Sequence, residues 1–363
     1  MFTKLKKFFI FLLLLLLTAV SLVSCPSLTE QLPPEVGTLV EQLESLPRKL
    51  DRLAQKADDL SEELTDLLRR AAAWLDSLTQ PPPPEVTDSS TFAVHFVDVG
   101  QADCALVACD GQYMLIDGGN AEDSDLVYTY LKEQNVTHLD YLVATHLHED
   151  HFDALLRYLD TVERGGDAGF DLGEIWGHVL SSAWYEGQGL GSYAGRAERL
   201  KNPPAGIGYT ELNRGDCFAF GAARMEVLWT GREDVRCNMN DSSVVYKMLC
   251  GGQSVLFLGD AEWVCNNDLL ENCRESLKSD VVQVGHHGCG NVSRECYEVI
   301  GATAYLWPIG PRFWYGESGE GLNTHNTGVI RSRVYMKEIG VKPENVYVNM
   351  DRIISLPLPI PLA

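Results

Sequence analysis

The sequence lacks the short motifs of several common enzyme and nucleotide-binding classes. It has no Gly-x-Ser-x-Gly nucleophile motif, no Walker phosphate-binding loop and no Cys-x-x-Cys pair. Positive charge is also scarce, since 29 Lys and Arg face 51 Asp and Glu, for a formal net charge of −22. Such a surface repels phosphate backbones, which argues against a protein that coats nucleic acid irrespective of its sequence. Hydrophobic residues make up 45% of the chain, enough to bury a core, so wholesale disorder is excluded.

The first residues have the pattern of a secretory signal. Three lysines precede the apolar run Phe8–Leu17, which is shorter than the roughly 20 residues of a membrane span. The following Leu22-Val23-Ser24-Cys25 resembles the lipobox of bacterial lipoproteins, in which the chain is cut before the Cys and the Cys is acylated. That resemblance implies a lipidated Cys25 and a membrane-anchored protein outside the bacterial cytoplasm. An ordinary signal peptide or an uncleaved anchor is the alternative.

A helical segment is predicted between this signal and the rest of the chain. Apolar residues recur at alternating three- and four-residue intervals from Val36 to Leu78, as in a coiled-coil seam. Because a proline breaks a helix interior, Pro47 limits the expected helix to 48–79. The helix is either a stalk that forms a homo-oligomer or an amphipathic helix that packs on the following domain. The stiff spacer Pro81–Pro84 then marks a boundary. The predicted parts are a signal peptide (1–24), a lipid anchor with helix and linker (25–90), and a globular domain (91–363).

Nine cysteines remain beside Cys25, which is an odd number, and several lie in apolar, strand-like runs. Their spacing fits no zinc knuckle. The pattern favours buried thiols over the disulfides that are common in exported proteins. It does not assign the disulfide status of each cysteine.

Beyond residue 90 the pattern changes to short apolar strands with polar side chains directly after them. Strands are predicted at 92–97, 113–116, 141–144, 254–258 and 280–284, with a helix near 125–134. The residues that follow these strands include several metal-capable side chains, namely Asp98, Asp117, His146, Asp260 and His286. Catalytic groups are often placed on such loops, so a functional site is expected where these loops meet.

The most informative segment is His146-x-His148-x-Asp150-His151, directly after a predicted buried strand. Histidines at i and i+2 of an extended segment point the same way, so both imidazoles can reach one metal ion. The Asp and His that follow can reach a second ion as the chain turns into a helix. Nitrogen and carboxylate ligands suit zinc first, with manganese or iron as alternatives. A solvated polar loop is a poor alternative, because four ligand-type residues fall within six positions.

This motif, the upstream Leu-Ile-Asp-Gly-Gly at 115–119 and the downstream Gly259-Asp260 together resemble the metallo-β-lactamase superfamily. Within it, His95–Asp103 resembles the segment that opens the hydrolase domain of the ComEC competence proteins. Asn240-x-x-Ser243-x-Val245 and the Gly-His-His-Gly at 285–288 recur in that branch as well. The resemblance covers roughly residues 92–355, without the transmembrane channel of the competence proteins.

The resemblance implies an α/β fold, a four-layer αβ/βα sandwich, with two metal ions at one edge. The implied ligands are His146 and His148 for the first ion, Asp150, His151 and His287 for the second, and Asp260 as the bridge. Asp150 and His286 are the implied catalytic residues, with His286 facing the substrate; the choice between His286 and His287 as ligand stays open. The implied supporting or substrate-contacting residues are Asp98, Gln101, Asp103, Asp117 and Asn240.

The chain departs from the family pattern at several positions. Phe152-Asp153 replaces the two glycines that usually follow the main motif, and Ala102 and Cys289 replace a glycine and a serine. Whether His178 or His325 contributes to the site stays open. These changes bear on the substrate more than on the metals.

The implied chemistry is hydrolysis by a water molecule that two divalent metal ions activate. A phosphodiester is the expected substrate, small or surface-bound, because the acid excess argues against long nucleic acid. The alternatives are a lactone, ester or β-lactam hydrolase of the same fold, or a non-catalytic surface scaffold.

Overall fold

The computed structural model describes residues 91–290, 292–315, 324–350 and 354–357. The chain divides into two units between Pro82 and Pro83, and every described residue belongs to the second unit. The predicted signal peptide, lipidation at Cys25, helix at 48–79 and proline-rich spacer lie outside the described residues. No helix in the described ranges is long and apolar enough to cross a membrane.

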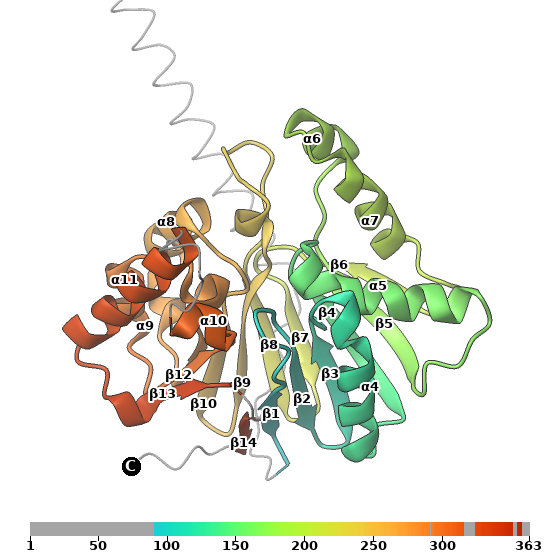
Figure 1. The fold of residues 1–363 in the computed structure, drawn as a ribbon, viewed down its shortest axis with the longest axis horizontal. Helices are drawn as coiled ribbons and strands as arrows, with labels where there is room; N and C mark the ends of the chain where they lie inside the picture. The colour runs from blue at the N-terminus through green and yellow to red at the C-terminus, as the bar shows by residue number, and fades with distance from the viewer. Residues whose placement is uncertain (1–90, 291, 316–323, 351–353, 358–363) are drawn as a thin grey trace, which may run out of the picture. The chain divides into compact units, whose positions relative to one another are not determined.

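The described residues form two seven-stranded mixed sheets (Figure 1). The first has the order β14-β1-β2-β3-β4-β5-β6 and the second the order β13-β12-β11-β10-β9-β8-β7. The strands of the first sheet are β1 (Ala93–Phe96), β2 (Ala105–Cys109), β3 (Gln112–Ile116), β4 (His138–Ala144), β5 (Asp171–Gly177), β6 (Gly208–Glu211) and β14 (Ile354–Pro357). Those of the second are β7 (Cys217–Phe220), β8 (Ala223–Trp229), β9 (Val245–Cys250), β10 (Gln253–Phe257), β11 (Val281–Gln283), β12 (Ala304–Trp307) and β13 (Val346–Val348).

Helices connect the parallel strands of both sheets. The α-helices are α4 (Ser124–Glu133), α5 (Glu149–Glu163), α6 (Ser182–Gly187), α7 (Gly191–Lys201), α8 (Trp263–Asn272), α9 (Arg294–Ile300), α10 (Pro311–Trp314) and α11 (Thr324–Glu338). The 3₁₀ turns are η1 (Ala121–Asp123), η2 (Asn240–Ser242), η3 (Arg274–Leu277), η4 (Gly285–Gly288) and η5 (Pro343–Asn345). Figure 1 shows α4 and α5 beside the first sheet, and α8, α9 and α11 beside the second.

Three layers of buried side chains separate four layers of backbone. One core lies between the first sheet and its helices, and includes Tyr130 of α4 and Leu155 of α5. A second core, with Phe96 and Phe257, lies between the two sheets. A third core, with Tyr297 of α9, fills the space between the second sheet and its helices. The predicted four-layer α/β sandwich is therefore confirmed.

The strand pairing places the polar loops at one edge of each sheet. β3, β4, β5 and β6 are mutually parallel, and so are β10, β11, β12 and β13. Since parallel strands end at the same edge of a sheet, Asp117 and His146 emerge together from β3 and β4. Asp260 and His286 emerge together from β10 and β11 in the same way.

The predicted elements that flank these loops are confirmed. The strand expected at 141–144 begins earlier, at His138, and the helix expected near 125–134 is α4. The prediction of buried thiols holds for most of the cysteines. All nine in the described residues are free, and all but Cys217 and Cys273 are buried.

Phe152 explains one departure from the family pattern. Its side chain is fully buried in the first core, on the face of α5 that packs against the sheet. We expect Phe152→Ala to lower the free energy of unfolding by about 3–5 kcal/mol, because it leaves a cavity in a packed core. Urea unfolding of the full-length chain measures this, with Phe218→Ala, a half-buried position, as the milder control. An unchanged unfolding midpoint in Phe152→Ala would contradict this packing.

Candidate metal centre

Three loops bring the candidate ligands together at the edge where the two sheets meet. His146, His148, Asp150 and His151 lie between the end of β4 and the first turn of α5. Asp260 follows β10, and His287 lies in η4 after β11. All of these except His148 and Asp150 are buried. Residues more than 100 positions apart therefore converge on one small volume.

The first group consists of His146, His148 and Asp260, whose ligand atoms lie within 4.8 Å of one another. His146 Nε2 is 3.0 Å from His148 Nδ1 and 3.8 Å from Asp260 Oδ2. Two imidazole nitrogens and one carboxylate oxygen thus face a common point. Three protein ligands with an open position are the usual arrangement of a catalytic zinc site.

The second group forms around the other oxygen of the same carboxylate. Asp260 Oδ1 is 3.1 Å from His151 Nε2 and 3.5 Å from His287 Nε2. Asp150 closes the group, because its Oδ2 is 3.3 Å from His287 Nε2. The Asp103 carboxylate also lies within 4.8 Å of donor atoms of His151, Asp260 and His287. Asp260 therefore presents one oxygen to each group, as a bridging ligand would.

Unpartnered atoms show that the residues fit a metal. Among the described residues, the buried atoms His151 Nε2, His287 Nε2 and Asp260 Oδ1 make no well-aligned hydrogen bond, although the two nitrogens lie only 3.1 and 3.5 Å from that oxygen. Buried polar groups are nearly always paired, so such a cluster calls for an explanation. All three atoms converge on the second group. A divalent cation would satisfy all of them at once.

The charges around the centre also favour cations. Burial, with His151 nearby, lowers the pKa of His146 well below its usual value, which keeps this imidazole neutral and able to ligate. Burial alone would lower the pKa of His287, but Asp260 and Asp103 raise it to about 9. The pKa of His151 is raised for the same reason, by Asp260, Asp150 and Asp117 against the effect of burial. The carboxylates around the second group thus attract positive charge.

Asp117 fixes the orientation of His151. Its Oδ2 accepts hydrogen bonds from His151 Nδ1 at 2.8 Å and from the Thr145 hydroxyl at 2.7 Å, and its Oδ1 accepts one from the Thr145 backbone N–H. Asp117 has a positive φ of 54°, a conformation that side chains other than glycine rarely adopt. The bond at Nδ1 leaves His151 Nε2 to face Asp260.

We expect Asp117→Asn to weaken metal binding by about 10–100-fold, the usual effect of removing a group that orients a ligand. Competition with a chromophoric chelator measures the affinity. Thr129→Val is the control, because the Thr129 hydroxyl bonds only within α4. Equal affinities for Asp117→Asn and the unmodified chain would show that Asp117 has no part in holding His151.

His286 lies beside the first group but is not a member of it. Its Nε2 is 3.7 Å from Asp260 Oδ2, while its Nδ1 bonds to Glu262 Oε1 at 2.9 Å. Asn240 donates to the same Glu262 oxygen at 3.2 Å. Burial would lower the pKa of His286, but Asp260 and Glu262 raise it. His286 therefore turns Nε2 towards Asp260, while Glu262 holds its other ring nitrogen.

The η4 turn that carries both histidines has an unusual backbone. His286 and His287 have φ values of 49° and 52°, and left-handed residues in succession are costly outside glycine. Gly288 follows with φ 76°, and a side chain there would overlap the Trp307 ring. Such strain is typical of functional sites, and here it turns both imidazoles towards Asp260.

The other predicted residues lie at varying distances from the centre. Asp98 accepts a hydrogen bond from the Gly100 N–H and so stabilises its own turn. Gln101 bonds to Cys289 Sγ at 3.5 Å and to the Gly310 N–H at 3.3 Å, which ties its loop to the segments after η4 and β12.

His178 is held elsewhere, with Nε2 2.9 Å from the Gly231 carbonyl and Nδ1 2.9 Å from Glu211. Its side chain therefore contributes no ligand. The side chain of His325 lies outside the described part of the chain.

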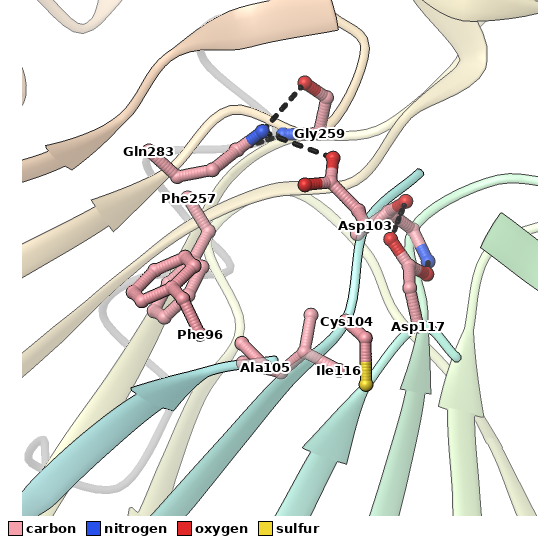
Figure 2. Close-up of a pocket in the computed structure, with 10 residues that line it drawn as sticks. Phe96, Asp103, Cys104, Ala105, Ile116, Asp117, Phe257, Gly259 and Gln283 are labelled. Atoms are coloured by element: carbon pink, nitrogen blue, oxygen red, sulfur yellow. Dashed lines mark hydrogen bonds between the residues drawn. The ribbon is translucent and has the colours of Figure 1, made fainter. Parts of the chain in front are cut away.

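Asp103 and Gln283 form a buried pair between the sheets (Figure 2). Gln283 Nε2 donates to Asp103 Oδ2 at 3.0 Å and to the Gly259 carbonyl, while its Oε1 accepts from the Leu258 and Gly259 N–H groups. A cavity of about 10 Å³ adjoins them, room for about one water molecule. Burial raises the pKa of Asp103 to about 7, assisted by Asp260 and Asp117. Gln283 thus fixes the loop that carries Asp260.

One side of the centre is formed by α7, which the sequence did not predict as part of the site. The Tyr193 ring lies 5.7 Å from the His148 ring, and its hydroxyl donates to Glu149. Arg196 pairs with Asp153 at 2.6 Å and donates to the Leu147 carbonyl. Asp153, the second departure from the glycine pair, therefore fastens α7 to the metal-binding loop.

The fold and the site together define a two-sheet α/β protein with a candidate dinuclear metal centre. Residues 97–161 match the model of the metallo-beta-lactamase superfamily, and that range contains the whole His-x-His-x-Asp-His motif. This segment therefore matches the superfamily that the sequence resemblance implied.

The chain is also similar in sequence or structure to several known proteins. The chain is 25% identical over 221 residues to ComE operon protein 3 of Bacillus subtilis, a match covering 55% of this chain and 26% of that protein. It therefore spans about a quarter of that relative. Among solved structures it is similar to the metallo-beta-lactamase fold protein YhfI of Bacillus subtilis, with 12% identity over 73% of this chain and 99% of that one, at a TM-score of 0.46. It is also similar to CmlA, a diiron beta-hydroxylase from Streptomyces venezuelae, with 16% identity over 77% and 55% of the two chains, at a TM-score of 0.43.

Proposed function

We propose that this protein is a metal-dependent hydrolase of phosphodiesters. The observation that supports it best is the position of Asp260, with one oxygen facing His146 and the other facing His151 and His287. That division suits a carboxylate shared by two ions. Bound there, two divalent cations, with zinc the first expectation, would supply a water nucleophile at neutral pH and stabilise the charge that develops on the substrate.

The residues of the chain have distinct tasks in this proposal. Asp150 has the most exposed carboxylate at the centre, since 30% of its side chain is accessible against 9% for Asp103 and 2% for Asp260. It is therefore placed to accept a proton from the attacking water and pass it to solvent. His286 presents Nε2 towards Asp260 with 15% of its side chain accessible, where it can donate a hydrogen bond to an anionic oxygen of the substrate.

A phosphodiester suits this centre better than a β-lactam. A phosphodiester carries negative charge throughout the reaction, so it gains from two cations and an imidazole donor together. A lactam carbonyl is neutral until attacked and gains less from fixed positive charge. The net charge of −22 favours a small or surface-bound phosphodiester over long nucleic acid, whose binding needs many cationic contacts.

The test is a substrate panel with the full-length, metal-loaded chain in a mild nonionic detergent. Bis-nitrophenyl phosphate, a lactone and a chromogenic cephalosporin are compared at equal enzyme concentration. We expect the highest kcat/KM on the phosphodiester. A much faster turnover of the lactone or cephalosporin would replace this proposal by the alternative reaction. No turnover of any of them, despite bound metal, would favour a scaffold.

The predicted anchor belongs to the same proposal, since it sets where the enzyme acts. We propose a bacterial lipoprotein whose domain lies outside the cytoplasm, supported by the charged start, the short apolar run and the lipobox-like segment before Cys25.

We expect the chain to incorporate labelled palmitate in a bacterial host and Cys25→Ala to incorporate none. Cys217→Ala, which removes an exposed cysteine of the globular domain, is the matched control. Equal labelling of the Cys25→Ala form would place the lipid elsewhere or exclude it.

A further inference from the structure

A second hollow, with no candidate metal ligand in its lining, adjoins the third core. It has a volume of about 410 Å³ and walls from β12, β13, α10 and α11. Small-molecule sites generally measure about 300–1,000 Å³ and have mostly apolar walls. Trp307, Met336 and Val346 supply such a wall here. The size and the lining are those of a ligand pocket.

The charged residues at this pocket are both cations. Arg333 and Lys337 are its only charged lining residues, although the chain has 51 acids and 29 bases. They lie four positions apart on α11, hence on one face of the helix, and both are exposed. No described carboxylate forms an ion pair with either side chain. The rim is therefore positive in an otherwise acidic protein.

Arg333 is held in place at this rim. Its guanidinium lies 4.4 Å from the centre of the Trp314 ring, and its Nη1 donates to the Trp314 carbonyl at 3.4 Å. Trp314 in turn packs edge-on against Trp307, with the ring centres 5.1 Å apart. An ordered guanidinium loses less freedom when it binds an anion than a mobile one would.

We propose that this pocket binds a single-chain anionic amphiphile, a fatty carboxylate, with the alkyl chain against Trp307 and Met336 and the carboxylate between Arg333 and Lys337. The alkyl chain would extend the apolar packing of the third core. The carboxylate would meet the two cations at the rim, where Arg can bind it through two parallel hydrogen bonds. The proposal does not depend on the metal centre or its chemistry.

Photolabelling of the full-length chain tests this proposal. The probe is decanoate with a diazirine in mid-chain, applied in maltoside detergent, irradiated and mapped by peptide mass spectrometry. We expect the adducts to concentrate in peptides from 334–350 and to fall when plain decanoate competes. Adducts spread along the chain, or concentrated in another segment such as 1–90, would overturn the proposal.

Variants that change the charge at the pocket provide a second test of the proposal. Lys337→Glu should lower the labelling of 334–350 by about threefold or more. It replaces an exposed positive charge that attracts the carboxylate by a negative charge that repels it. Lys132→Glu makes the same change of charge on α4 and should leave the labelling unchanged. The matching diazirine alcohol should label weakly and respond to neither variant. Equal labelling of the Lys337→Glu and Lys132→Glu chains by the carboxylate would overturn the proposal.

Discussion

Replacing Asp260 by Ala is expected to remove more than one metal ion from each chain. The two oxygens of this carboxylate face different groups, with Oδ1 3.1 Å from His151 Nε2 and Oδ2 3.8 Å from His146 Nε2. Removing a ligand that serves a single ion would release only that ion. Metal per chain should therefore fall from about two equivalents to below about one, as measured by elemental analysis after gel filtration.

Two further variants separate metal loss from misfolding. Asp260→Asn keeps the side-chain size and should lose metal as Asp260→Ala does, with an unchanged circular dichroism spectrum. Asp98→Asn is the matched control, because the Asp98 carboxylate only stabilises its own turn and lies outside both ligand groups. Loss of a single equivalent in both Asp260 variants would show that the carboxylate serves one ion.

Replacing His286 by Ala is expected to leave the metal content unchanged and to lower kcat on bis-nitrophenyl phosphate by about 10²–10³. That factor is typical for removing one donor that stabilises transition-state charge. His286 lies outside both ligand groups, yet its Nε2 is 3.7 Å from Asp260 Oδ2. Steady-state kinetics and elemental analysis of the same preparation measure both quantities.

The control for this variant is His138→Ala, which removes an exposed imidazole at the start of β4. It should keep both metal and activity. Glu262→Gln should lower kcat less than His286→Ala does, since it weakens the hydrogen bond that holds the His286 ring but leaves the ring in place. If His286→Ala loses an equivalent of metal, His286 is a metal ligand. The proposal that it donates a hydrogen bond to the substrate would then be wrong.

The metal-binding motif was predictable because its chemistry is local. His146, His148 and His151 lie within six positions after an apolar strand, so their spacing alone indicates convergence on metal. Strand periodicity also placed Asp117 and Asp260 at strand ends. Parallel strands end at one edge, which brings such residues together without further information.

Glu262 and Tyr193 could not be predicted in the same way. Glu262 matters through its bond to His286, 24 positions away, and no periodicity links the two. Tyr193 reaches His148 only because α7 folds back over the loop, fastened by the pair between Arg196 and Asp153. Gln283 did leave a signal, as a polar residue inside the buried strand β11. Its partners Asp103 and Gly259 follow only from how the two sheets pack.

The departures from the family pattern have physical reasons that only packing shows. Phe152 fills the first core where a glycine would leave space, and Asp153 anchors α7. Cys289, at the position of the usual serine, accepts a contact from Gln101 at 3.5 Å, which joins two loops. Composition and spacing identify each substitution but not the neighbour that accommodates it.

Elemental analysis of the purified full-length chain tests the central claim most directly. After reconstitution with zinc or manganese and removal of free metal, we expect close to two equivalents per chain, because the two ligand groups share Asp260. Asp117→Asn and Asp260→Ala, measured in parallel, should bind less. A chain that keeps no metal after either treatment would contradict the dinuclear centre and the hydrolase proposed from it.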